Sequence, residues 1–200
     1  MPQQPNSPFI LLREFLKRPR QVASIIPSSR LLQRCVVDFA DVRSAKRIVE
    51  LGPGTGGTTR AILRAMAPDA QLLSIEINPY LCGVVGRIRD ERLILHLGDA
   101  SDLREIVAGY GFDKPEAVIS GIPFSTMHQA PGAELLRVIE SLLAPEGHFV
   151  AYQVSRKIVW LSYPCLKLAA PEKRLVLFNL PPIWVLQWEK IASSKEPSVH

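Results

Sequence analysis

The chain has 200 residues, 47% of them hydrophobic and 22% charged, and a formal net charge of +5 at pH 7. These values predict one domain with a substantial core, and no apolar run reaches the ~18 residues that a membrane span needs. The N-terminus lacks a basic-then-apolar signal region, so we expect a cytoplasmic protein. The cysteines are odd in number and far apart, which predicts free thiols and no metal site.

The first predicted element is an amphipathic helix in a strongly basic N-terminal segment. Residues 1–47 carry a net charge of +6, which leaves −1 for the remainder of the chain. Within residues 9–18, apolar side chains fall on one helical face and charged side chains on the other, and Pro19 ends the pattern. The apolar face consists of Phe9, Leu11, Leu12, Phe15 and Leu16, and the cations are Arg13, Lys17 and Arg18. Peripheral contact with an anionic membrane surface is the favoured interpretation, and packing against its own domain is the alternative.

A glycine-rich turn follows the first predicted strand. Arg47, Ile48 and Val49 predict a short buried strand, and residues 55–67 have apolar positions at helical spacing. The glycines between them let the backbone take conformations that other residues avoid, and let a ligand approach main-chain N–H groups at the start of the helix. The turn therefore predicts a nucleotide-cofactor site.

Two cofactor motifs fit this turn. Gly52-x-Gly54-x-x-Gly57 matches the dinucleotide fingerprint, with Glu76 directly after the next predicted strand, residues 72–75. Glu50-x-Gly52-x-Gly54-x-Gly56 resembles the first motif of the class I S-adenosylmethionine (SAM) methyltransferases. Glu50 favours SAM, because a carboxylate would repel a pyrophosphate and attract the cationic methionine end of SAM.

The next two predicted strands, residues 93–95 and 117–119, are followed by segments that this family also uses. Asp99 and Ala100 resemble the segment that contacts adenine, and Ser120 begins the segment where the family places its methyl acceptor. The resemblance implies that Glu76 binds the ribose hydroxyls and that Asp99 lies near the adenine amino group. The implied cofactor site consists of Glu50, Gly52, Gly54, Thr55, Gly56, Thr58, Glu76, Ile77, Asp99, Ala100 and Ser120.

The acceptor side of the site is expected in the loop that follows residues 117–119. The carbonyls of Ser120 and Gly121 are expected to orient the acceptor, with Pro123 shaping the loop. Tyr152 and His128 are candidates for a proton acceptor. For each of these two side chains, a surface or core role is the competing interpretation.

The remaining predicted elements complete a Rossmann-like α/β fold. A helix is expected at 133–143, a strand at 149–154, and an antiparallel pair at 174–178 and 183–188. The resemblance implies a mostly parallel seven-stranded sheet that ends in this C-terminal antiparallel hairpin, with helices on both faces. We expect an N-terminal arm and helices over residues 1–45, a SAM-binding methyltransferase domain over 46–191 and a loose tail over 192–200.

Three further motifs narrow the resemblance. Ile26-Pro27-Ser28-Ser29, Ser120-Gly121-Ile122-Pro123 and Asn179-Leu180-Pro181-Pro182 look like elements of the short bacterial phospholipid N-methyltransferases, over about residues 9–189. That resemblance implies methylation of the amine headgroup of phosphatidylethanolamine at the membrane surface. Phe124-Ser125-Thr126 and Gln153-Val154 depart from the pattern of that family.

Other functions share parts of the same pattern. The rRNA adenine dimethylases resemble the chain in the glycine motif, but they carry Asn where Ser120 stands and usually have a C-terminal helical domain. Nucleic acid is therefore a less favoured partner than a phospholipid. Methylation of a small molecule or a protein, and a SAM-fold protein that only binds a membrane or a partner, are the remaining alternatives.

Overall fold

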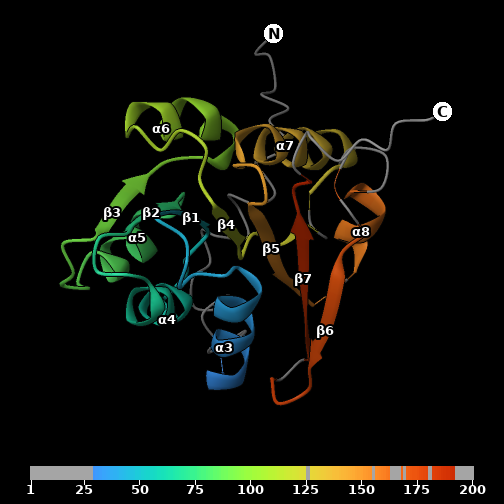
Figure 1. Ribbon diagram of the computed structural model, residues 1–200, viewed down its shortest axis with the longest axis horizontal. Coiled ribbons are helices and arrows are strands. Elements are labelled where there is room, and N and C mark those ends of the chain that lie inside the picture. Colours follow the sequence, from blue (N-terminus) through green and yellow to red (C-terminus); the bar gives the residue numbers. More distant parts are fainter. Residues whose placement is uncertain are drawn as a thin grey trace, which may run out of the picture.

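The computed structural model describes residues 29–124, 127–154, 156–162, 168, 170–179 and 182–191. Its strands form one seven-stranded sheet in the order β3-β2-β1-β4-β5-β7-β6 (Figure 1). The strands are β1 (Arg47–Leu51), β2 (Gln71–Glu76), β3 (Leu93–Leu97), β4 (Ala117–Ser120), β5 (His148–Gln153), β6 (Glu172–Val176) and β7 (Ile183–Glu189). The first five strands pair in parallel, and β7 pairs antiparallel with both β5 and β6. The predicted seven-stranded sheet with a C-terminal antiparallel hairpin is confirmed.

Helices cover both faces of the sheet, as Figure 1 shows. They are α3 (Arg30–Phe39), α4 (Gly57–Ala65), α5 (Pro79–Val85), η1 (Ala100–Asp102), α6 (Leu103–Gly109), α7 (Gln129–Leu142) and α8 (Lys157–Ser162). One buried cluster joins α3 and α4 to the sheet, and a second joins α6, α7 and α8 to it. Because helices cover both faces, the central strands β1 and β4 are almost entirely buried.

The bounds of three predicted elements need correction. The helix predicted at 55–67 begins at Gly57, because the N-cap residue Gly56 takes a left-handed, non-helical conformation with φ 80°, and it ends at Ala65, because Met66 is extended. The helix predicted at 133–143 begins earlier, at Gln129. Pro131 is tolerated there, because N–H groups in the first turn have no partner within the helix.

The third correction concerns the C-terminal hairpin. The strand predicted at 174–178 is β6 (Glu172–Val176), so Leu177 and Phe178 lie in the turn rather than in the sheet. The ladder ends where Val176 pairs with Ile183. Pro182 stands directly before that pair, and proline has no N–H to extend the ladder. The side chains of Leu177 and Phe178, in the turn, are exposed.

Some expectations lie partly or wholly outside the described residues. The amphipathic helix predicted at 9–18 and the tail predicted at 192–200 are outside them, as is Cys165. Cys35 and Cys82 are free thiols. In the part of the chain that the structure describes, no helix is long and apolar enough to cross a membrane.

Candidate active site

The predicted cofactor and acceptor segments meet at the carboxyl edge of the parallel strands. Leu51 at the end of β1 is in register with Ile75 of β2 on one side and with Ser120 of β4 on the other. The Gly52 N–H donates a hydrogen bond of 2.9 Å to the Ile75 carbonyl, and the Gly121 N–H donates one of 2.8 Å to the Leu51 carbonyl. The glycine loop (residues 52–56) and the acceptor loop (residues 120–124) thus leave the sheet side by side, at the edge where open α/β sheets bind ligands.

The glycine loop has the geometry of a cradle for a ligand. Gly54 has a φ of 57°, and a Cβ built on it would meet no atom within 4 Å. Gly54 therefore faces open space with a backbone conformation that favours glycine. Thr55 next to it is exposed, whereas Thr58 in the first turn of α4 is buried.

Glu50 is a fully buried carboxylate directly before this loop. Its Oε2 accepts hydrogen bonds from the Thr59 hydroxyl at 2.7 Å and the Ser74 hydroxyl at 2.9 Å. Its Oε1 is buried and has no hydrogen-bond partner among the residues that the structure describes. Burial raises the pKa of Glu50 to about 7, although the two hydroxyls act in the opposite direction. An unpartnered buried carboxylate oxygen fits a site that receives a cation.

Glu76 at the end of β2 is also buried, and it is bonded to the glycine loop. Its Oε2 accepts a hydrogen bond of 3.2 Å from the Gly54 N–H, and its Oε1 accepts one of 2.9 Å from the Asn78 N–H. Burial raises the pKa of Glu76, against the lowering effect of these backbone donors. The Ile77 N–H is a third backbone donor to this carboxylate, which offers about four acceptor positions, so Glu76 retains capacity for a further hydroxyl donor.

The segments after β2 and β3 hold the other predicted cofactor residues. Ile77 follows Glu76 and is partly buried. The Asp99 side chain accepts a hydrogen bond of 2.9 Å from the Ser101 N–H and so caps η1, whose first residue, Ala100, is buried. The Gly98 N–H donates to the Glu76 carbonyl at 3.0 Å, so both segments lie at the same edge as the glycine loop.

The acceptor loop is fixed by two polar side chains. The Ser120 hydroxyl accepts a hydrogen bond of 3.3 Å from the Ile122 N–H. Gln153 at the end of β5 donates to the Ile122 carbonyl at 2.6 Å and accepts from the Phe124 N–H at 3.1 Å. Both Ser120 and Gln153 are buried, whereas Gly121 and Pro123 are partly exposed. The loop is therefore held rigidly on both sides of Pro123.

Tyr152 lies where the glycine and acceptor loops meet. A Cβ built on Gly121 would collide with the Tyr152 hydroxyl and would lie 2.7 Å from the Gly52 carbonyl oxygen. Burial raises the pKa of Tyr152, and the negative charge of Glu50 raises it further, against a hydrogen bond with Thr58. Tyr152 therefore stays protonated at neutral pH. His128, the other predicted proton acceptor, is exposed at the start of α7.

Sequence reasoning missed three buried residues that organise this site. Thr59 and Ser74 bond Glu50, and Gln153 bonds the acceptor loop. A polar residue at an otherwise apolar position of β2, α4 or β5 is the sequence signal that marks all three. Within the described ranges, no group of three or more His, Cys, Asp or Glu side chains is placed to hold a metal ion.

Comparisons with known proteins identify similar chains. No family model matches. The chain is 32% identical over 143 residues to an ornithine lipid N-methyltransferase of Singulisphaera acidiphila, covering 70% of this chain and 74% of that protein. It is 32% identical over 96 residues to a ribosomal RNA small subunit methyltransferase A of a Nostoc species, covering 45% of this chain and 34% of that protein. Among solved structures, the N-methyltransferase NodS of Bradyrhizobium japonicum in complex with S-adenosyl-L-homocysteine has a TM-score of 0.66 at 11% identity, covering 90% of this chain and 96% of NodS.

Proposed function

Because the chain belongs to the class I SAM-dependent methyltransferases, we propose that it transfers a methyl group from SAM to the amine of a membrane-lipid headgroup. The similarity to an ornithine lipid N-methyltransferase carries this proposal, since it extends over 74% of that protein. Phosphatidylethanolamine and ornithine lipid are the two lipids to test first as methyl acceptors. The sequence motifs favour the former, and the similarity favours the latter.

The donor side of the proposal assigns a role to each buried acid. SAM, when bound, supplies a methyl group on a cationic sulfonium. The unpartnered Oε1 of Glu50 would complement the positive charge of the methionine part. Glu76 would accept hydrogen bonds from the ribose hydroxyls, and Asp99 would face the adenine amino group. The open space at Gly54 would admit the ligand next to the main chain.

The acceptor side of the proposal depends on the rigid loop after β4. None of the described residues donates a hydrogen bond to the Gly121 carbonyl. This oxygen is therefore the best candidate to accept a hydrogen bond from the substrate amine, with the Ser120 carbonyl beside it. Gln153 and Pro123 would act by holding the loop in place, since the alignment of amine and methyl group is the main requirement of this chemistry.

The substrate amine must lose a proton before it attacks. An ethanolamine ammonium has a pKa of ~10, like that of Lys, and transfer from water into a poorly solvated site lowers it. The raised pKa of Tyr152 argues against a phenolate base. We propose instead that the neutral Tyr152 hydroxyl accepts a hydrogen bond from the substrate amine. This hydrogen bond would orient the lone pair of the amine nitrogen.

Adenine N-methylation in RNA is the second candidate, because several relatives of the ribosomal RNA methyltransferase A type match about half of the chain. Ser120 argues against it, since the sequence pattern of that family places Asn there to orient the exocyclic amine. One competition assay separates the two functions. Labelled SAM is offered to the full chain with anionic vesicles containing phosphatidylethanolamine, with vesicles containing ornithine lipid, and with RNA. Label in a lipid amine supports the proposal, and label in RNA alone contradicts it.

A further inference from the structure

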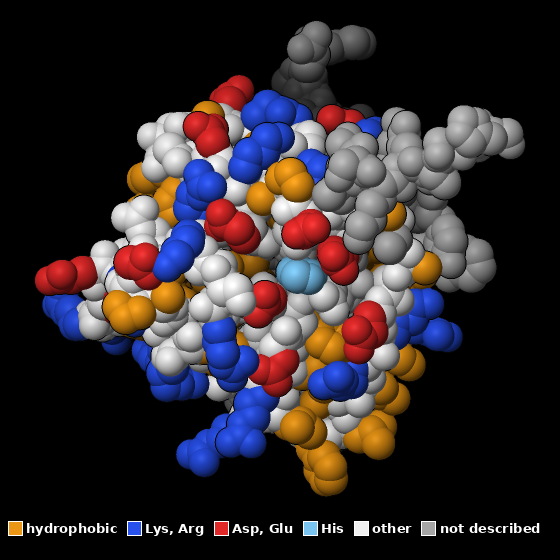
Figure 2. Space-filling model, viewed as in Figure 1, with side chains coloured by type: hydrophobic (Ala, Val, Ile, Leu, Met, Phe, Trp, Pro, Cys, Tyr) orange, Lys and Arg blue, Asp and Glu red, His pale blue; other side chains and the backbone are white. Residues whose placement is uncertain are grey.

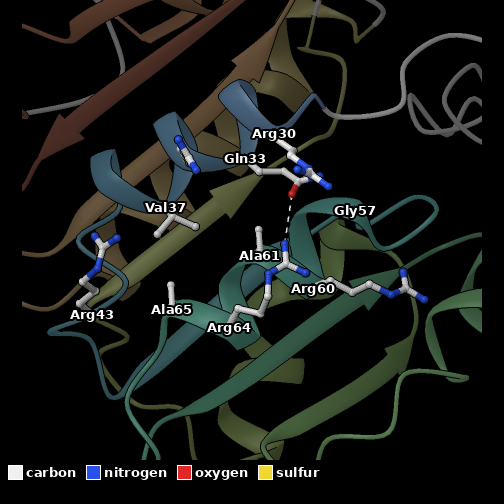
Figure 3. Close-up of a pocket in the computed structure, with 10 residues that line it drawn as sticks. Arg30, Gln33, Val37, Arg43, Gly57, Arg60, Ala61, Arg64 and Ala65 are labelled. Carbon is white, nitrogen blue, oxygen red and sulfur yellow. Dashed lines mark hydrogen bonds between the residues drawn. The ribbon is translucent and has the colours of Figure 1, made fainter.

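A basic cavity lies between α3 and α4, outside the site described above. It has a volume of about 690 Å³. Figure 3 shows the two helices side by side with the lining side chains between and around them. Five of these are arginines, namely Arg30, Arg34, Arg43, Arg60 and Arg64, and the other lining residues are neutral. We call this cavity the arginine groove.

Most of the positive charge in the arginine groove is not balanced by carboxylates. Arg43 forms an ion pair of 2.9 Å with Asp38. The other four arginines form no ion pair with any carboxylate among the described residues. Arg64 donates to the neutral Gln33 side chain at 3.2 Å, and Arg60 donates to the Gly56 carbonyl at 3.1 Å. Guanidinium groups bind phosphates and carboxylates through charge-assisted hydrogen bonds, so the excess of them around one cavity favours an anionic ligand.

An apolar surface adjoins the basic one. Leu175, Leu177 and Phe178, at the end of β6 and in the turn that follows, have exposed fractions of 38%, 65% and 85%. We call these three residues the apolar tip. The Ser29 N–H donates a hydrogen bond of 3.1 Å to Oδ1 of Asn179, which ties this turn to the residue that caps α3. In Figure 2, hydrophobic side chains at the end of the hairpin and Lys or Arg side chains meet along one edge of the molecule.

The arginine groove and the apolar tip together distinguish between two anionic partners, RNA and a phospholipid bilayer. RNA would contact the arginines through its phosphates and could stack an unpaired base on Phe178, but it has no counterpart for the exposed Leu175 and Leu177. A bilayer accommodates both, because lipid phosphates meet the cations while apolar side chains enter the layer below. Exposed leucines beside a cluster in which four of five arginines have no carboxylate partner among the described residues therefore favour a lipid surface.

We propose that the arginine groove binds the phosphates of anionic phospholipids while Leu177 and Phe178 insert into the bilayer, which makes this face the membrane-docking surface. The inference rests on the proposed function in one respect, that the acceptor is presented by a membrane. Arg60 contacts the glycine loop through the Thr55 and Gly56 carbonyls, so docking through this groove would bring the donor side of the active site next to the lipid surface.

The first test measures co-sedimentation of the full chain with vesicles of phosphatidylcholine, alone or mixed with phosphatidylglycerol. The double variant Arg34→Glu, Arg64→Glu should bind the anionic vesicles about 30-fold more weakly than the parent, and Phe178→Ser about 10-fold. Arg104→Glu with Arg137→Glu, on α6 and α7 at the other face of the sheet, makes the same charge change and should bind like the parent. Calorimetric SAM binding checks that each variant is folded.

A second measurement locates the contact independently of the N-terminal segment. The chain already has three tryptophans, so the signal is the difference from the parent. Phe178→Trp should add fluorescence that lipids brominated in their acyl chains quench, whereas the fluorescence added by Ile191→Trp, which replaces another exposed apolar residue, should not be quenched. Absence of this quenching, or anionic vesicle binding by the Arg34→Glu, Arg64→Glu variant equal to the parent, overturns the proposal. Tight binding of inorganic phosphate without vesicle binding would make the groove a phosphate site. RNA binding that is lost in the same variant, with vesicle binding unchanged, would make it a nucleic-acid site.

The inference and the proposed function fail in different ways. Vesicle binding through the arginine groove without methylation of any lipid amine would contradict the function and leave the docking surface intact. Methylation of a detergent-dispersed lipid amine, with vesicle binding that does not depend on Arg34, Arg64 or Phe178, would contradict the docking surface and leave the function intact.

Discussion

Nε2 of Gln153 donates a hydrogen bond of 2.6 Å to the Ile122 carbonyl oxygen, which joins the end of β5 to the acceptor loop. The same side chain accepts from the Phe124 N–H, so both of its polar atoms are used within one buried contact. Rigidity of the acceptor loop therefore depends on a residue 31 positions away in the sequence.

Replacement of Gln153 by Leu should weaken acceptor use and stability without affecting the donor. The variant removes both side-chain hydrogen bonds to the loop and leaves the Ile122 carbonyl and the Phe124 N–H only the 2.9 Å hydrogen bond between them, at a cost of about 1–3 kcal/mol in all. We expect a lower free energy of unfolding and a higher KM for the acceptor, with SAM affinity close to that of the parent. Gln187→Leu, at a partly exposed position on β7, is the matched control. A KM unchanged by Gln153→Leu would show that the loop does not position the substrate.

Gly54→Val should abolish SAM binding by filling the space that the cofactor needs. Two effects must be separated, because valine at a φ of 57° also strains the backbone by about 1–2 kcal/mol. Gly111 provides the control, since it has a φ of 70° and its Cβ direction is equally open. Both variants should lose similar stability, and only Gly54→Val should lose SAM binding in calorimetry. If Gly54→Val bound SAM as tightly as Gly111→Val does, the methyl donor would bind elsewhere.

Glu50 should make SAM affinity depend on pH. A cation binds better to the ionised carboxylate, so affinity should rise between about pH 6 and about pH 8, around the Glu50 pKa of about 7. Glu50→Gln keeps an oxygen that can accept from Thr59 and Ser74, and it places an amide where Oε1 lacks a partner. Calorimetry should find weaker SAM binding by this variant, with little dependence on pH.

The free energy of unfolding should fall as pH rises, whereas SAM affinity rises. A carboxyl whose pKa is higher in the folded chain binds its proton more tightly there, so the free energy of unfolding falls as pH rises from the ordinary value of 4.5 to about 7 and is level above it. Glu50→Gln should remove this fall and stabilise the protein at about pH 8 by up to about 3 kcal/mol. Glu134→Gln, at an exposed position, should change neither the pH dependence of the free energy of unfolding nor its value at about pH 8. A loss of stability in Glu50→Gln would mean that the buried charge is balanced by the protein itself.

Most strands could be predicted because they are short apolar runs separated by helical spacing or by glycine, and the seven-stranded sheet that they form followed from the resemblance to the class I methyltransferases. The glycine loop was equally clear, since Glu50, Gly52 and Gly54 occupy fixed positions between a strand and a helix. The predicted ends of helices and strands were wrong where a single residue decides the backbone conformation. Gly56 delays α4, and the strand predicted to reach Phe178 ends at Val176.

Contacts between distant segments could not be predicted. Gln153 looked like a departure from a family pattern, and only the fold brings it to Ile122. Arg34 and Arg64 belong to different helices, so the arginine groove exists only once α3 packs beside α4. Along the sequence, the net positive charge lies before Ile48. In the structure, Arg60 and Arg64 of α4 join arginines of that segment around one cavity.

Tyr152→Phe should lower kcat without changing the pH profile of the reaction. The raised pKa keeps the hydroxyl protonated throughout the neutral range, so its removal eliminates a hydrogen bond and not a titrating base. A lost hydrogen bond of about 1–1.5 kcal/mol corresponds to roughly a 10-fold decrease in rate. Measurement of kcat against pH for parent and variant tests this. Loss of an ionisation near neutral pH in the variant would restore Tyr152 to the role of proton acceptor.

The N-terminal segment should provide a second membrane contact that is independent of the arginine groove. Phe15→Ser with Leu16→Ser removes part of its apolar face, and each of Arg13, Lys17 and Arg18 is worth ~1 kcal/mol near a charged bilayer. Both the apolar variant and the charge reversal of these three cations should reduce sedimentation with anionic vesicles and leave SAM binding intact. Combined with Phe178→Ser, the apolar variant should lose more binding than either change alone, because the two contacts lie in different parts of the chain. Equal sedimentation with neutral and anionic vesicles, or loss of folding when residues 1–18 are removed, would instead identify the segment as packing for the domain.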